Sequence, residues 1–121
     1  MTNGKKKGAR GEREWSAFCH AQGYETRRTQ QYCGGTEESA DVIGLPGIHQ
    51  EVKRAERLNI EDAMMQAEHD SVSSGNIPIV AHRRNHEKWK VTMYADDWFR
   101  QDRNGRKRRK ANSEKACTVP Q

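Results

Sequence analysis

Three side chains in the middle of the chain have the types and spacing needed for chemistry on a phosphate ester. Residues 39–54 read SADVIGLPGIHQEVKR, and within this stretch Glu51 and Lys53 are two residues apart. Because the side chains of a strand alternate between its faces, Glu51 and Lys53 point to one side while Val52 points into the core. Asp41 lies on the strand that comes before them. The pattern places a carboxylate beside an amine, with a second carboxylate on the neighbouring strand.

The register of the hairpin between these strands decides whether Asp41 joins the other two. A two-residue turn at positions 46 and 47 would leave Asp41 opposite Val52, on the wrong face of the sheet. A connection of three residues would instead pair Asp41 with Glu51 or Lys53. We therefore predict an odd-length connection or a bulge in this hairpin.

Two carboxylates without a thiolate or an imidazole are the hard oxygen ligands that Mg²⁺ or Mn²⁺ takes. Such an ion can lower the pKa of a bound water and stabilise charge on phosphoryl oxygens. Lys53 is then placed to orient the water or to stabilise the charged transition state. An acid and a lysine two apart on a strand also form ordinary surface ion pairs, so the short motif alone does not decide.

Hydrophobic periodicity predicts the elements that hold these residues. Residues 11–22 form a helix with Trp15, Phe18 and Cys19 on one face and Glu12 at the edge of that face. Strands follow over residues 24–29, 40–45 and 48–54. Asn59 caps a second helix that ends before Gly75, and strands over 77–82 and 89–94 lead to a short helix from about 96. The order αβββαββ predicts an α/β fold, a mixed sheet flanked by helices.

The charge of the chain is concentrated at its ends. Residues 1–13 carry five basic groups and one acid, residues 100–115 carry eight and two, and residues 14–99 carry nine and fourteen. We expect a basic flexible N-terminus over residues 1–8, one folded domain over 9–100, and a basic, disordered tail over 101–121. Such ends attract phosphate backbones without reading sequence, although a solubilising role is the simpler alternative.

Several classes of protein are excluded by what the sequence lacks. It has no run of about 18 apolar residues for a membrane span, and no apolar stretch follows the basic start as in a secretory signal. It also lacks a phosphate-binding loop and a dinucleotide fingerprint, so no nucleotide cofactor is expected. The three cysteines are odd in number and have no paired metal spacing. We expect a cytoplasmic protein that is not secreted and has no membrane partner.

Taken together, these features resemble the PD-(D/E)XK nuclease superfamily. The superfamily order is an acid on the first helix, an Asp on one strand, Glu-x-Lys on the next strand, and then a helix. More narrowly, RGERE, the Gly-Gly loop, residues 39–54 and the second helix are similar to archaeal-type Holliday junction resolvases and their phage-encoded relatives, over about residues 8–99. Ala40 stands where the superfamily name has proline, which changes no ligand. The resemblance implies a restriction-endonuclease-like fold.

The resemblance also implies roles for individual residues. Asp41 and Glu51 would ligate Mg²⁺, for which Mn²⁺ could substitute, with the backbone carbonyl of Val52 as a further ligand. Lys53 would activate the attacking water, and Glu12 would supply a water-mediated or second-metal contact. The DNA-contacting residues would be Arg13, Arg27, Arg28, Tyr32, Gly34, Gly35, Ser39, Arg54 and Arg57. Independently of the resemblance, His49 shares the strand face of Glu51 and could contact substrate.

The expected function is therefore a Mg²⁺-dependent endonuclease that cuts branched DNA in recombination and repair, most of all a four-way junction. Because junction resolution needs two symmetric incisions, we expect a homodimer. Two alternatives stay open. One is a catalytically idle DNA-binding accessory protein that keeps the fold, and the other is a nuclease of the same fold that acts on flaps, nicks or linear duplex.

Overall fold

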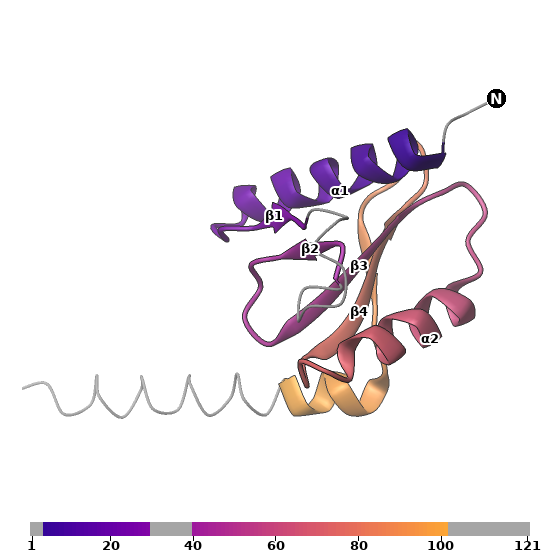
Figure 1. Cartoon of the computed structure of the whole chain (residues 1–121). Helices are drawn as coiled ribbons and strands as arrows, with labels where there is room; N and C mark the ends of the chain where they lie inside the picture. The colour runs from indigo at the N-terminus through magenta and orange to yellow at the C-terminus, as the bar shows by residue number, and fades with distance from the viewer. Residues whose placement is uncertain (1–3, 30–39, 102–121) are drawn as a thin grey trace, which may run out of the picture.

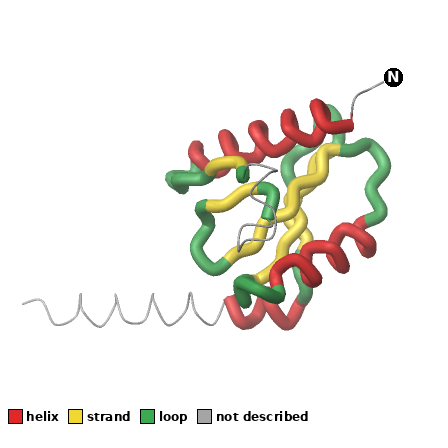
Figure 2. Tube along the Cα trace, viewed as in Figure 1, coloured by secondary structure: helices red, strands yellow, loops and turns green. Residues whose placement is uncertain are grey.

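The computed structural model describes residues 4–29 and 40–101, which form one mixed sheet with helices on both faces (Figures 1 and 2). The five strands lie in the order β1-β2-β3-β4-β5. β3 and β4 are parallel, while the other neighbouring pairs are antiparallel. The element order and the mixed sheet confirm the α/β fold class expected from the sequence.

Helix α1, Gly4–Ala21, packs on one face of the sheet. It places Trp15 and Cys19 against Val52, in one buried cluster. A Cβ on Gly11 would lie 2.7 Å from the Cβ of Arg54, so only glycine lets α1 approach β3 this closely. The helix begins seven residues earlier than predicted, inside the segment expected to be a flexible N-terminus. The reason is that the lysines, Ala9 and Arg10 favour helix without adding apolar periodicity.

The first three strands are neighbours in the sheet, and the second and third form a hairpin. The first two are shorter than predicted. The three strands are β1 (Arg27–Arg28), β2 (Val42–Ile43) and β3 (Ile48–Arg54). Gly44 leaves β2 with a φ of 118°, and any side chain there would collide with the carbonyl of Glu25. This close approach ends β2 and holds the loop after α1 against the hairpin.

Helix α2, Ile60–Ser71, covers the other face of the sheet. Asn59 caps it, because its side chain accepts a hydrogen bond from the amide of Asp62 at 3.1 Å. Ala63, Met64 and Ala67 are buried against Val80. The predicted cap is confirmed.

The last two strands complete the sheet. They are β4 (Ile77–Arg83) and β5 (Lys90–Thr92), and residues 95–101 form a further helical segment. Parallel pairing aligns β3 and β4 along their whole length, from Ile48 opposite Ile77 to Arg54 opposite Arg83. Both strands therefore end at the same edge of the sheet. Beyond residue 101, the predicted basic tail lies outside the described residues.

Of the helices that the structure describes, none has the length and apolar character needed to cross a bilayer.

Candidate active site

The register of the β2–β3 hairpin brings Asp41 and Glu51 together. Val42 is paired with Gln50, and the amide of Ile48 donates to the carbonyl of Leu45 at 3.1 Å. Continuing this register leaves three residues, 45–47, in the connection and puts Asp41 opposite Glu51. The predicted odd-length connection is confirmed.

The backbone next to Asp41 departs from a regular ladder. The Asp41 amide donates to the carbonyl of Gln50 at 2.9 Å, one residue out of step with the Val42 pairing. The amide of Val52 donates to Oδ2 of the Asp41 carboxylate, also at 2.9 Å. A β-bulge is the usual device for re-aiming a side chain next to a functional site. Here the local irregularity fixes the Asp41 carboxylate beside β3.

The environment of Asp41 disfavours its negative charge. Burial raises the pKa of Asp41 to about 7, and the neighbouring carboxylate of Glu51 adds to the rise. The Val52 amide and the charge of Lys53 act in the opposite direction but do not cancel the rise. Two buried acids share a space with too little positive charge to neutralise both. A divalent cation would supply that charge, so the donor set fits a metal site.

Glu51 has a second neighbour on its own strand. Its Oε1 atom lies 2.9 Å from Nε2 of His49, and both side chains are 2% exposed. Asp70 of α2 approaches the same pair, so that one ligand atom from each of the three residues lies within 4.8 Å of the others. This cluster could also hold a cation. Because it includes an imidazole, it would suit Mn²⁺ or Zn²⁺ better than Mg²⁺.

Lys53 and Glu12 complete the predicted catalytic set. Lys53 is close enough for its charge to lower the pKa of Asp41, as strand alternation from Glu51 requires. Burial raises the pKa of Glu12, and the charge of Asp41 contributes to the rise. An ion pair with Arg28, whose Nε lies 2.7 Å from Oε2 of Glu12, acts against it. The other three predicted side chains, Glu12, Glu51 and Lys53, thus lie within electrostatic range of Asp41.

The residues predicted to contact DNA fall into three groups. Arg13, Arg27 and Arg57 are exposed. Arg28 forms an ion pair with Glu12. The guanidinium of Arg54 contacts Glu14 and Asn85, and the Arg54 side chain is 12% exposed. The remaining predicted contacts lie outside the described residues: Tyr32, Gly34, Gly35 and Ser39.

Asp70 is the neighbour of the site that sequence reasoning missed. Nothing in the spacing of α2 marks this acid, because its approach to His49 depends on how α2 docks on the sheet. The sequence indicates His49 through its strand parity alone. An acidic residue on the helix that follows the Glu-x-Lys strand is the sequence signal that could have identified Asp70.

The fold, one mixed sheet between helices, is that of the restriction-endonuclease-like α/β class. No family model matches the sequence, and no curated protein matches it significantly. Among solved structures, the chain is similar to Hjc of Archaeoglobus fulgidus, a Holliday junction resolvase from an archaeal hyperthermophile. The TM-score is 0.54 at 20% sequence identity, and the match covers 69% of this chain and 73% of that one. The resemblance drawn from the sequence motifs is confirmed for the fold.

Proposed function

We propose that the protein is a metal-dependent DNA endonuclease that cuts branched DNA, with the four-way junction as its main substrate. The observation that carries the proposal is the meeting of Asp41, Glu51 and Lys53 at one hairpin, in a fold shared with a junction resolvase. An ordinary surface ion pair does not explain a carboxylate as buried as Glu51, at 2% exposure.

In this proposal Asp41 and Glu51 hold Mg²⁺, or Mn²⁺ in its place, with the carbonyl of Val52 as a third protein ligand. The bound ion supplies a lowered pKa for a water molecule and stabilisation of charge on the phosphate. Lys53 orients the attacking water through its amino group. Glu12 contributes a water-mediated contact, for which the ion pair with Arg28 fixes its position.

DNA contacts in the proposal come from the exposed arginines and from the basic ends of the chain. Arg13, Arg27 and Arg57 are free to reach phosphates, because no ion pair holds them among the described residues. The activity belongs in the cytoplasm of a prokaryotic or phage-infected cell, where it would serve recombination and repair.

Two copies of the chain are needed for two symmetric incisions, so we propose a homodimer. Support comes from exposed apolar side chains on β5 and on the helical segment after it. Val91 lies on the edge strand β5, and Trp98 and Phe99 lie on the helical segment that follows it, all about half exposed. Analytical ultracentrifugation tests this assembly, and a monomer at micromolar concentration would contradict both the dimer and junction resolution.

Cleavage of three labelled DNAs tests the function: a four-way junction, a flap and a linear duplex, each with Mg²⁺, with Mn²⁺ and with EDTA. We expect metal-dependent cutting that favours the junction and is lost in Glu51→Gln. Glu25→Gln, which removes an exposed carboxylate elsewhere, should cut as the wild type does. Wild-type protein that binds the junction but cuts no DNA with either ion would establish the accessory-protein alternative. Equal cutting of all three DNAs would remove the preference for junctions.

A further inference from the structure

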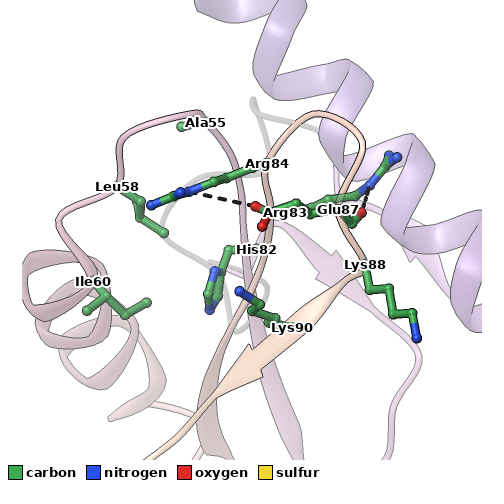
Figure 3. Close-up of a pocket in the computed structure, with 9 residues that line it drawn as sticks. All are labelled: Ala55, Leu58, Ile60, His82, Arg83, Arg84, Glu87, Lys88 and Lys90. Carbon is green, nitrogen blue, oxygen red and sulfur yellow. Dashed lines mark hydrogen bonds and ion pairs between the residues drawn. The ribbon is translucent and has the colours of Figure 1, made fainter.

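A cavity of about 210 Å³ lies where β3 and β4 end, on the side of the sheet covered by α2 (Figure 3). One wall is apolar and consists of Ala55, Leu58 and Ile60. The other wall is basic and comes from the end of β4, the turn after it and the start of β5. We call the cavity the basic pocket; its second wall consists of His82, Arg83, Arg84, Glu87, Lys88 and Lys90.

The basic pocket carries excess positive charge, whereas the folded part as a whole is acidic. Residues 14–99 contain nine basic and fourteen acidic residues, and four of the nine basic residues line this one cavity beside a single acid, Glu87. All four lie within eight consecutive residues, from the end of β4 to the start of β5. A cleft lined by one sign of charge and bordered by apolar walls concentrates its field and attracts ions of the opposite sign.

Ion pairs among the described residues neutralise only some of these basic side chains. Arg83 donates to Glu14 at 3.2 Å and to the carbonyl of Glu87, while the only ion pair of Arg84 within the described part of the chain is a long contact of 3.8 Å to Glu87. Lys88 and Lys90 have no acidic partner among residues 4–29 and 40–101. Figure 3 shows the amino group of Lys90 turned towards His82 and Arg84 extending above Leu58, whereas Lys88 points away.

The sheet register connects the basic pocket to the candidate active site. Lys53 is paired with His82, and His82 is paired with Lys90, so the three residues form one row across β3, β4 and β5. Neighbouring strands are about 4.8 Å apart, which puts the Lys90 backbone roughly 10 Å from that of Lys53. One DNA strand presents a phosphate about every 3.4 Å along the helix axis. A DNA strand that follows this row would therefore present another backbone phosphate to the pocket within a few nucleotides of one held at Lys53.

We propose that the basic pocket binds a backbone phosphate of the DNA strand being cut, on the β5 side of the scissile phosphate, through Arg84 and Lys90. The inference rests on the proposed nuclease function and deepens it, because a second fixed phosphate sets the direction of the strand across the site. The apolar wall formed by Leu58 and Ile60 contacts the adjacent deoxyribose. His82, whose Nε2 lies 2.8 Å from Oγ1 of Thr92, lies beside Lys90 in the same wall of the pocket.

Binding of a fluorescent four-way junction, measured by anisotropy in EDTA at several KCl concentrations, tests the pocket without any cleavage. Arg84→Gln and Lys90→Gln should each weaken binding by about tenfold and lower the salt slope by about one. Arg100→Gln is the matched control, because Arg100 and Arg84 are both exposed (53% and 65%) and both face an acid three residues away. The control measures how much binding affinity is lost when any one exposed cation is removed. Effects of Arg84→Gln and Lys90→Gln no larger than that of Arg100→Gln would overturn the proposal.

A second measurement locates the DNA directly. The chain has only two leucines, Leu45 and Leu58, so leucine-selective methyl labelling gives one NMR reporter on the pocket wall and one at the far hairpin. Adding the junction should shift the Leu58 methyl signals, and Arg84→Gln/Lys90→Gln should abolish the shift. Unchanged Leu58 signals at saturating DNA would refute the pocket. These readouts do not depend on cutting, so a wild type that fails to cut would overturn the nuclease proposal separately.

Discussion

Nε2 of His49 lies 2.9 Å from Oε1 of Glu51, and both side chains are 2% exposed. A buried carboxylate of this kind needs a partner, because an unpaired buried charge is costly. The imidazole occupies one oxygen of Glu51 and restricts the carboxylate to one orientation. His49 is therefore a positioning residue for the proposed metal ligand, and, with Asp70, it offers an imidazole to a transition-metal ion.

Replacing His49 by alanine should change the metal preference of the protein as well as its stability. We expect a loss of about 1–3 kcal/mol in the free energy of unfolding, because Glu51 loses a buried hydrogen bond. The affinity for Mn²⁺ should fall more than the affinity for Mg²⁺, since imidazole favours the softer ion. Isothermal titration with each ion measures this difference, and His69→Ala, an exposed histidine on α2, is the control. A parallel loss for both ions would assign His49 to folding alone.

The raised pKa of Asp41, about 7, predicts how the metal-free protein responds to pH. Between the ordinary pKa of an aspartate and pH 7, the folded state binds more protons than the unfolded state, so stability falls as the pH rises through this window. One pKa unit corresponds to about 1.4 kcal/mol, so the loss should exceed about 1 kcal/mol. Thermal melting in EDTA from pH 5 to pH 8 measures it.

Other ionisable groups contribute to the same pH curve, so the wild type must be compared with Asp41→Asn. The pKa of His82, for example, is lowered by burial and by Lys90, which gives the opposite slope. Asp41→Asn should gain stability over the wild type as the pH rises, and Mg²⁺ should stabilise only the wild type. Parallel pH curves for the two proteins would show that Asp41 ionises freely.

The sequence predicts those features of the structure that are determined by residues close together in the chain. The cap of α2 by Asn59 and the limits of β3 follow from neighbouring residues, and both were predicted correctly. The start of α1 was not, because its first turns carry helix-forming residues without an apolar pattern. Arg54 was expected to reach DNA, yet Glu14 holds it, which depends on how closely α1 packs at Gly11. Such contacts between distant elements leave no trace in local spacing.

The tail beyond the described residues is expected to add affinity without chemistry. Residues 102–121 contain seven basic and two acidic residues. Removing residues 101–121 should weaken junction binding and flatten its salt dependence, because fewer counterions are released from DNA. Cleavage at saturating protein should stay at the wild-type rate. An unchanged salt slope would reduce the tail to a solubilising segment.

Gln50 is a buried polar group that the fold satisfies only in part. Its side chain is 0% exposed; Oε1 accepts from the indole nitrogen of Trp15 at 2.7 Å, while Nε2 has no partner among the described residues. Trp15→Phe should therefore cost about 1–3 kcal/mol, since it leaves the amide without its remaining bond. The double variant Trp15→Phe/Gln50→Met should recover part of this loss. Urea unfolding measures both, with Trp89→Phe as the control for ring size.

The three-residue connection of the hairpin has a consequence for judging distant relatives of this chain. A homologue that lost one residue between positions 45 and 47 would keep every acid and lysine of the proposed site, yet its aspartate would face the opposite layer of the molecule. Loss of two residues would restore the arrangement. Under the proposed function, whether such a relative can cut DNA depends on whether the length of a surface turn is odd or even, which a comparison of residue identities alone does not reveal.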